Sequence, residues 1–343
     1  MVAWNLCSVT VILYNGHVVN RVDGAFQHPV TLVLLHMVAN TLLTQALAAC
    51  GLLAVPALGW GAYLRAVPGL GLLFAGALAC SLTATSRLGL ATVQMVKALA
   101  PLLSLLVVTA TGGERPRLTL LAAALLMSAG VGISALGAPA RLDALGLGLQ
   151  VCALLCEAVR MVCIQRTIQA SLPRANPLAA LALFAPVCAA CLLPLSLHVE
   201  PGALVELATA PPATHLLLLG NAAAACALNV CSVWLLSQPN GPLLLTFVGV
   251  VKDFEIFPLV YFFKGARIRY IQVAGYALAL LGVNLYNAFK STAGGAELPL
   301  GKLLGVATSN RMAAVMAAGV LVMLGIAGEG AGTGAASAGG GGA

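Results

Sequence analysis

Long apolar stretches separated by short polar breaks dominate the chain. Leu, Val, Ala and Met fill blocks of about 17–25 residues, the length that a helix needs to cross roughly 30 Å of hydrocarbon. The breaks, such as 111–116 and 238–242, are short and rich in Gly and Pro, so consecutive helices must run antiparallel and pack together. The pattern predicts ten transmembrane helices, at 3–19, 30–54, 66–84, 88–110, 118–137, 143–165, 177–198, 213–236, 242–263 and 268–289.

The composition supports this interpretation. Of the 343 residues 61% are hydrophobic and 8% charged, whereas about 25% of the residues of a soluble domain are charged. The chain is therefore predicted to be an all-α polytopic membrane protein whose partner is the lipid bilayer. The net charge of +7 comes from basic residues that stand singly in loops, without interleaved aromatics, which excludes a nucleic-acid interface. These charges divide evenly between the two membrane faces, so they leave the orientation open.

The ten cysteines lie almost entirely inside apolar blocks. Cys188 and Cys191 have the spacing of a metal or redox pair, but their neighbours are Ala, Val and Leu and no His is near. We therefore expect cysteines that pack between helices, with no metal and no cofactor. No basic segment precedes the first apolar block and no Arg/Ser-rich transit segment is present, so we expect no cleaved targeting peptide.

The composition changes after Lys290, where a Gly/Ala-rich tail covers 291–343. We expect its last residues, 331–343, to be disordered. The apolar segment 312–328 is just long enough to cross the membrane, and it is equally suited to lie on the bilayer surface.

An internal repeat relates the two halves of the chain. Val93-Gln-Met-Val-Lys97 recurs as Val248-Gly-Val-Val-Lys252, and a proline follows each, at 101 and at 258. Ala129-Gly-Val-Gly-Ile likewise recurs as Leu281-Gly-Val-Asn-Leu. The offset corresponds to five spans, and an odd number inserts the halves in opposite directions. The chain is therefore predicted to form two inverted five-helix repeats, 1–141 and 142–290, as in alternating-access carriers.

Charged side chains inside the bilayer cost at least about 2.5 kcal/mol each, so each needs a role. Lys252 lies roughly 15 Å from either end of its span and Lys97 roughly 14 Å from the start of its span, which puts both near the midplane. Two lysines at equivalent repeat positions predict an anion site between the halves. Glu255 could instead neutralise Lys252 within one helix, and Asp253 or Glu255 could hold Lys97 until an anionic solute displaces it.

Other polar residues inside the spans could complete the site. Glu157 and Arg160 are three residues apart and predict an ion pair with a structural or gating role. Each of the uncharged residues could contact solute or could only hydrogen-bond a neighbouring helix. His36 is expected to be a packed histidine. The uncharged candidates for solute contact are Tyr14, Thr83, Gln94 and Asn229, and Asn15, Ser81 and Asn221 are further polar residues of the spans.

Several segments resemble one known family, in the family's order and over about residues 1–290. They are 10–15 with 29–32, 92–101, 157–160, 225–229, 249–253 and 275–287. These segments are similar to the plant triose-phosphate translocator/nucleotide-sugar transporter group of the drug/metabolite transporter superfamily. The resemblance is greatest to the subgroup with Lys-Asp in helix nine, the probable sugar phosphate/phosphate translocators.

The resemblance implies ten helices, cytosolic termini and obligate exchange of a phosphorylated solute for phosphate or a nucleoside monophosphate. In the family's phosphate translocators a lysine in helix four and a Lys-Arg pair in helix nine hold the phosphate. Lys97 and Lys252 match the lysines, but Asp253 stands in place of the arginine. Glu255 and Ser81-Leu-Thr83 also depart from the subgroup's pattern.

The combined expectation is an antiporter, not an enzyme, that exchanges a sugar phosphate or related organic anion for phosphate. A nucleotide-sugar/nucleoside-monophosphate exchanger is the alternative within transport, and a non-transporting membrane receptor or scaffold is the alternative from another class. No paired aspartates, Ser/His dyad or His-Glu-x-x-His motif is present for intramembrane catalysis. Without a transit segment, the Golgi or another endomembrane is expected rather than the plastid envelope.

Overall fold

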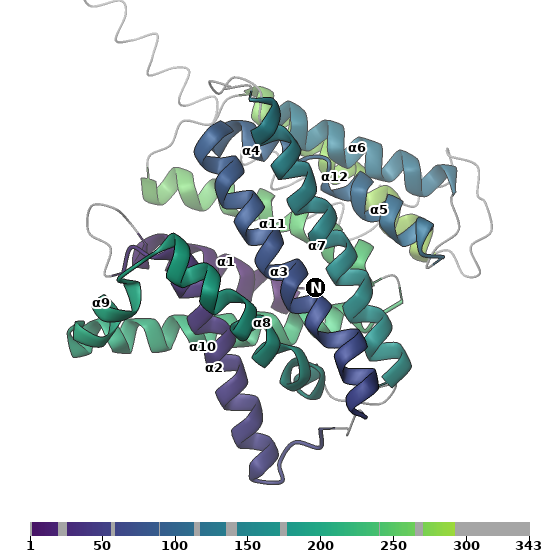
Figure 1. The fold of residues 1–343 in the computed structure, drawn as a ribbon. Coiled ribbons are helices and arrows are strands. Elements are labelled where there is room, and N and C mark those ends of the chain that lie inside the picture. The colour runs from purple at the N-terminus through teal and green to yellow at the C-terminus, as the bar shows by residue number, and fades with distance from the viewer. Residues whose placement is uncertain are drawn as a thin grey trace, which may run out of the picture. The chain divides into compact units, whose positions relative to one another are not determined.

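The computed structural model describes residues 2–19, 26–55, 59–88, 90–112, 117–134, 143–171, 177–239, 241–264 and 270–291. Within these ranges the elements are helices, with no strand (Figure 1). The tail, with its apolar segment at 312–328, lies outside them. The helices are α1 (Val2–Val18), α2 (Pro29–Ala49), α3 (Trp60–Leu88), α4 (Leu90–Lys97), α5 (Ala100–Ala110), α6 (Leu118–Ser134), α7 (Ala144–Ser171), α8 (Pro177–Val199), α9 (Ala203–Thr209), α10 (Pro212–Leu236), α11 (Gly241–Lys264) and α12 (Tyr270–Ser291).

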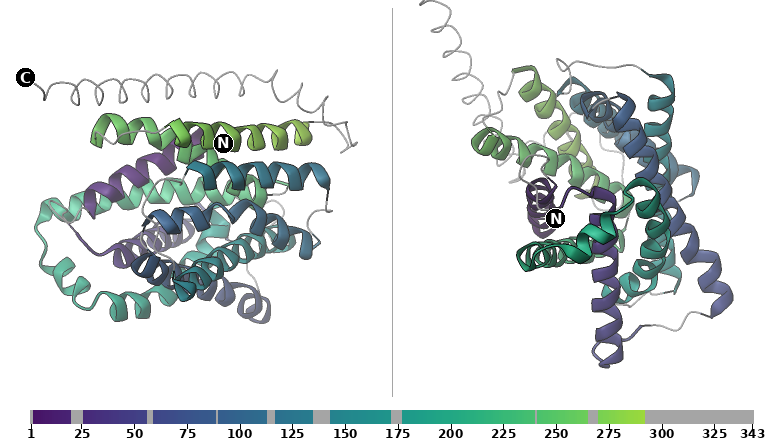
Figure 2. Two further views of the ribbon diagram at one scale, coloured as in Figure 1. Left: turned by 90° about the horizontal axis from the view of Figure 1, so that it is seen from above. Right: turned by 60° about the vertical axis from the view of Figure 1, so that its left-hand side comes forward.

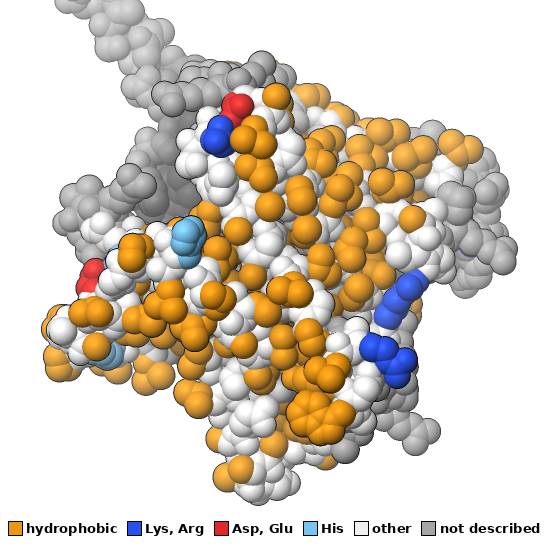
Figure 3. Space-filling model, in the orientation of Figure 1, with side chains coloured by type: hydrophobic (Ala, Val, Ile, Leu, Met, Phe, Trp, Pro, Cys, Tyr) orange, Lys and Arg blue, Asp and Glu red, His pale blue; other side chains and the backbone are white. Residues whose placement is uncertain are grey.

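These helices fall on the spans that the apolar blocks predict, and the short α9 is added between α8 and α10. In the described part, α2, α3, α7, α8 and α10 are long and apolar enough to cross a membrane, and shorter apolar helices accompany them. Hydrophobic side chains cover much of the face seen in Figure 3, and leucines such as Leu72 and Leu216 are largely exposed. Such a surface suits lipid rather than water. The chain is a polytopic all-α membrane protein.

One expected span is not a single helix. The prediction of one helix over 88–110 is wrong, because the structure divides it into α4 and α5. Pro101 has no N–H to donate to the carbonyl of Lys97 four residues earlier, and its ring would clash with that carbonyl in a continuous helix. The Leu99 amide instead donates to the Val96 carbonyl at 3.0 Å, and the Leu103 amide restarts the ladder with a bond to the Leu99 carbonyl at 2.9 Å.

The chain forms two compact units, and each draws on both halves of the sequence. The first unit consists of Met1–Thr83 and Cys152–Leu245, and the second consists of Ala84–Val151 and Thr246–Ala343. In the first unit α2 packs on α8 and α1 on α10. In the second, α6 lies beside α12 and α5 packs on α6 (Figure 2). A unit is therefore not the same thing as one of the proposed sequence repeats.

Two glycines allow the backbones of α6 and α12 to meet. A Cβ on Gly130 would lie 2.3 Å from the Ala279 nitrogen, and one on Gly282 would lie 2.7 Å from the Ala123 oxygen. Real Cβ atoms essentially never make contacts this short. The later residue of α6, Gly130, meets the earlier residue of α12, Ala279, and Gly282 meets Ala123. The two helices therefore run antiparallel. Glycine at these positions therefore sets the distance between the helices.

A carboxylate fixes one end of the α2–α8 pair in the first unit. Glu200, directly after α8, accepts hydrogen bonds from the backbone amides of Val30 at 2.9 Å and Thr31 at 2.8 Å. The Thr31 hydroxyl donates to the same carboxylate at 2.6 Å. His28, at the N-cap position of α2, makes no capping bond with its side chain. Glu200 therefore satisfies amides in the first turn of α2 from just beyond the end of α8, and its charge complements the helix dipole.

Replacing Glu200 by Gln is expected to destabilise the protein by about 1–2 kcal/mol, because the charged cap of α2 is lost. The measurement is reversible unfolding of the purified chain in mixed micelles. Glu206→Gln is the matched control, because its carboxylate pairs with His28 at 2.8 Å but is 54% exposed, and such pairs contribute about 0–1 kcal/mol. Equal effects of the two substitutions would contradict this role for Glu200.

Candidate functional site

The two candidate lysines belong to the same compact unit. Lys97 is the last residue of α4 and its side chain is exposed. Lys252 lies inside α11 and its side chain is half-buried. The position of Lys97 follows from the helix break, since Pro101 ends the hydrogen-bonding of α4 at this residue. The C-terminal end of a helix carries partial negative charge, which stabilises an ammonium group there.

A hydroxyl pair joins α11, which carries Lys252, to α5, the helix that follows Lys97 in the chain. The Oγ atom of Ser104 on α5 lies 3.0 Å from the Oγ1 atom of Thr246 on α11. Lys97 lies seven residues before Ser104 and Lys252 six residues after Thr246. Spans four and nine are expected to run in opposite directions, so both lysines would lie on the same side of this pair, with the break between α4 and α5 separating Lys97 from Ser104. That the two lysines lie at one depth stays a prediction.

Three other candidates of this unit fall partly outside the described residues. The backbones of Asp253 and Glu255 lie in α11 and that of Gln94 lies in α4, but their side chains are not among those described. The ion pairs expected between these acids and the lysines therefore stay predictions.

The remaining uncharged candidates lie in the first unit. Thr83 on α3 is exposed, and its hydroxyl donates to the Ala79 carbonyl of its own helix at 2.9 Å. Asn229 on α10 and Tyr14 on α1 are half-buried. Tyr14 packs against a core that includes Val18 and Leu218, and its hydroxyl would lie 2.6 Å from a Cβ added to Gly220. Glycine at 220 thus leaves room for the tyrosine.

A buried polar chain connects three helices of the first unit. The Nδ2 atom of Asn221 on α10 donates to the Oδ1 atom of Asn15 on α1 at 2.8 Å. The Oδ1 atom of Asn221 is hydrogen-bonded to the Nε2 atom of His36 on α2. Each side chain satisfies its neighbour, so these residues hold α1, α2 and α10 together.

Glu157 and Arg160 form an ion pair within α7. Nε of Arg160 donates to Oε2 of Glu157 at 2.9 Å, and the second bond is 2.5 Å long. The Arg160 guanidinium also lies over the Phe74 ring, 4.9 Å from its centroid. The pair is thus bidentate and stacked, which restricts both side chains to one geometry.

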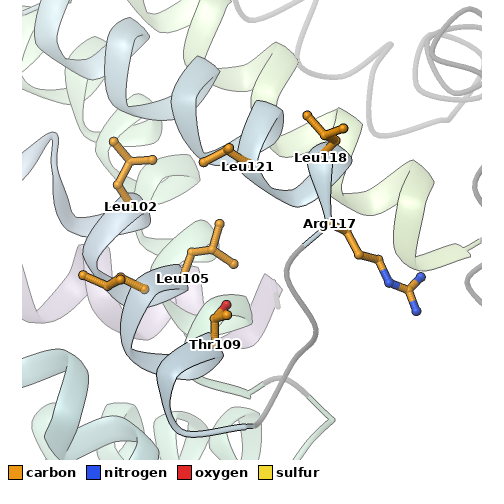
Figure 4. A pocket seen from close by; sticks show the side chains of 7 residues that line it. Leu102, Leu105, Thr109, Arg117, Leu118 and Leu121 are labelled. Carbon is orange, nitrogen blue, oxygen red and sulfur yellow. The ribbon is translucent and has the colours of Figure 1, made fainter.

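One pocket near these helices contains neither lysine. It lies between α5 and α6 and is lined chiefly by leucines (Figure 4). In the described part of the chain no group of three or more His, Cys, Asp or Glu side chains is arranged to hold a metal ion.

The sequence analysis did not predict three features of the structure: the helix break before Pro101, the Ser104–Thr246 contact and the role of Glu200. Pro101, four residues after Lys97, was a visible signal for the helix break. The Ser104–Thr246 pair carried no signal, because neither hydroxyl stands out among the Ser and Thr residues of apolar helices. Glu200 stood in a polar break, where a carboxylate is ordinary, and only the fold brings it to α2.

One solved structure, described only as the crystal structure of a protein, is similar in fold. Its TM-score is 0.57 at 18% identity, and the match covers 83% of this chain and 93% of that one.

Relatives of this chain are named as translocators. Two probable sugar phosphate/phosphate translocators of Arabidopsis thaliana are each 30% identical to this chain. The first match covers 83% of this chain and 76% of the relative, and the second covers 84% and 81%. A family model matches residues 1–287. The chain belongs to the Triose-phosphate Transporter family.

Proposed function

We propose that this chain is a secondary antiporter that exchanges a phosphorylated sugar, or a related organic anion, for phosphate across an internal membrane. The observation that carries the proposal is the family membership, together with relatives named as probable sugar phosphate/phosphate translocators. A transporter of this kind needs a cationic site at mid-membrane. It also needs helices whose movement exposes that site first to one side of the membrane and then to the other. The second unit offers residues for both.

Lys97 and Lys252 are the proposed phosphate anchors. Their ammonium groups would donate charge-assisted hydrogen bonds to the phosphate oxygens that different solutes share. The Ser104–Thr246 contact, which holds α5 against the helix of Lys252, supports a single site for both lysines. Asp253 and Glu255 would balance the lysines in the empty state, and Asp253 would also influence which anions are accepted.

The packing of α6 on α12 supports the inverted repeat that alternating access requires. The offset that carries Gly130 onto Gly282 also carries Ala123 onto Gly275 and Met127 onto Ala279. Gly130 meets Gly275 and Ala279, and Gly282 meets Ala123 and Met127. The contact is therefore unchanged when the two helices exchange roles, as a two-fold axis between inverted repeats demands. The boundaries 1–141 and 142–290 stay part of the proposal.

Pro101 cannot donate a hydrogen bond to the Lys97 carbonyl, and we propose that the resulting break between α4 and α5 is needed for transport. Pro101→Ala is expected to extend α4 into α5, because the new amide can donate to the Lys97 carbonyl. An interior proline costs a helix about 3 kcal/mol, so we expect a more stable protein that transports more slowly. Unfolding in mixed micelles and exchange in liposomes measure the two effects. Pro258→Ala in α11, which is continuous through its proline, is the matched comparison. A stable Pro101→Ala variant with full exchange would contradict the role.

Exchange by the purified chain in liposomes tests the function. Vesicles preloaded with phosphate, with uridine monophosphate or with buffer alone are offered labelled triose phosphate, hexose phosphate or a UDP-sugar. We expect sugar phosphate uptake that requires internal phosphate. UDP-sugar uptake that requires the monophosphate would replace the proposal with nucleotide-sugar exchange. Binding without exchange would indicate a receptor or scaffold. A fluorescent fusion would test the proposed Golgi or other endomembrane location.

A further inference from the structure

A proline interrupts the hydrogen-bond ladder of α8 in the first unit. The helix continues through Pro186, but this residue has no N–H to donate to the Ala182 carbonyl four residues earlier. A backbone carbonyl without a partner is costly inside a membrane, and neighbouring helices commonly supply one. Pro186 therefore divides α8 into two segments, residues 177–185 and residues 187–199, that are joined by a weakened ladder.

Two neighbouring helices donate hydrogen bonds to the carbonyls beside this break. The Nε2 atom of Gln45 on α2 donates to the Ala182 carbonyl at 3.1 Å. The hydroxyl of Tyr63 on α3 donates to the next carbonyl along α8, that of Leu183, at 3.3 Å. Gln45 thus replaces the bond that Pro186 cannot make, and Tyr63 binds the same turn of the helix.

The backbone of α3 also comes close to α8 just past the proline. A Cβ added to Gly71 would lie 2.9 Å from the Val187 carbonyl oxygen and 2.9 Å from the Sγ atom of Cys191. Glycine at this buried position lets the two helices approach directly. The helix α3 therefore contacts α8 on both sides of Pro186, through the Tyr63 hydroxyl before it and through the Gly71 backbone after it.

The two segments of α8 are held with different strength. Beyond the end of the second segment, the Glu200 carboxylate accepts three hydrogen bonds from the start of α2. In the last turns of α8 the Ser196 hydroxyl lies 2.7 Å from that of Thr31. Hydrogen bonds to a charged group are roughly twice as strong as neutral ones, and the bonds of Gln45 and Tyr63 are neutral. Residues 177–185 are therefore the part of α8 that opens at the lower free energy.

We propose that Pro186 is a hinge of α8, and that Gln45 and Tyr63 form a latch that holds residues 177–185 against α2 and α3. The inference rests on the proposed antiport, because a hinge of this kind serves a helix that moves in each transport cycle. Release of the latch breaks two neutral hydrogen bonds and leaves the charged contacts of Glu200 intact. Gln45 and Tyr63 are thus positioning residues, which act on transport through α8.

Hydrogen–deuterium exchange of the α8 amides, in the full chain reconstituted in lipid nanodiscs, measures the latch. Tyr63→Phe and Gln45→Met each remove one donor, and each is expected to accelerate exchange of the amides of residues 181–185 about fivefold. Thr41→Val on α2 is the matched control, because its hydroxyl donates to the Met37 carbonyl of its own helix at 2.8 Å. This variant should exchange like the wild type.

Pro186→Ala tests the hinge. The new amide can donate to the Ala182 carbonyl, so Gln45→Met should have no further effect on amide exchange in this background. Pro186→Ala should bind labelled phosphate with wild-type affinity. Its maximal rate of exchange against internal phosphate in liposomes should fall about fivefold, because a continuous ladder slows the movement of the helix. Pro194→Ala, exposed in the same helix, is the matched control and should be normal in both measurements.

Other results would overturn the proposal. Unchanged amide exchange in Tyr63→Phe and Gln45→Met would show that there is no latch. Additive effects of Gln45→Met and Pro186→Ala would show that Gln45 does not serve the carbonyl freed by the proline. A full rate of phosphate exchange in Pro186→Ala would reduce these contacts to a structural role. A wild type that exchanges no phosphate would instead refute the proposed function, and amide exchange would still decide whether α8 opens at Pro186.

Discussion

Lys97→Gln is expected to lower phosphate-dependent exchange roughly 10- to 150-fold, because a hydrogen bond to a charged group contributes about 1.5–3 kcal/mol. Lys252→Gln is expected to have a similar effect, since each lysine would supply one of two ammonium groups to the same phosphate. Lys97→Arg should retain more activity than Lys97→Gln, because it keeps the charge but changes the geometry. The measurement is the initial rate of labelled solute uptake into phosphate-loaded liposomes.

The double variant distinguishes one shared site from two separate ones. If both lysines hold the same phosphate, their effects will not add, because the second substitution acts on a site that is already lost. If they serve independent sites, the two free-energy changes will add. Arg65→Gln, which removes an exposed charge from α3 of the other unit, is the control and should transport normally. Full exchange by either single lysine variant would refute the proposed mechanism.

Gly130→Ala and Gly282→Ala are each expected to destabilise the protein by about 1–3 kcal/mol, the usual cost of overpacking. The added methyl group at 130 would meet backbone atoms at 2.3 Å and 2.5 Å, and the one at 282 would meet a carbonyl oxygen at 2.7 Å. Backbone atoms cannot rotate away as a side chain can, so α6 and α12 must separate. The measurement is the free energy of unfolding in mixed micelles.

A neighbouring glycine of the same helix provides the control. A Cβ on Gly132 would meet its nearest neighbour, the Ala98 Cβ, at 4.0 Å, which is ordinary contact. Gly132→Ala should therefore be neutral or slightly stabilising, because alanine reduces the freedom of the unfolded chain. Similar losses at 130 and 282 would agree with a two-fold contact. An unchanged stability of Gly130→Ala would show that α6 and α12 do not approach this closely.

Single residues of the candidate site could be predicted from the sequence, but the contacts between residues far apart in the chain could not. Lys97 and Lys252 were identified from charge inside apolar blocks, a signal that depends only on the cost of burying an ion. The Glu157–Arg160 pair followed from spacing on one helix. The hydroxyl contact of Ser104 with Thr246 could not be predicted, because two residues 142 positions apart meet only after several helices have packed. The same holds for Asn15, His36 and Asn221, which the fold joins into one chain of hydrogen bonds.

The apolar blocks predicted most of the helices and the class of protein, and charge inside those blocks identified Lys97 and Lys252 as candidates. Each of these depends on local chemistry: the length of an apolar block, a proline or a charge within it. Which helices share a compact unit follows from their packing, since the first unit combines residues 1–83 with 152–245. The tertiary structure also decided that Glu200 caps α2 and that glycines bring α6 against α12. Such contacts depend on the shape of surfaces far apart in the chain, and apolar periodicity carries no record of which surfaces fit together.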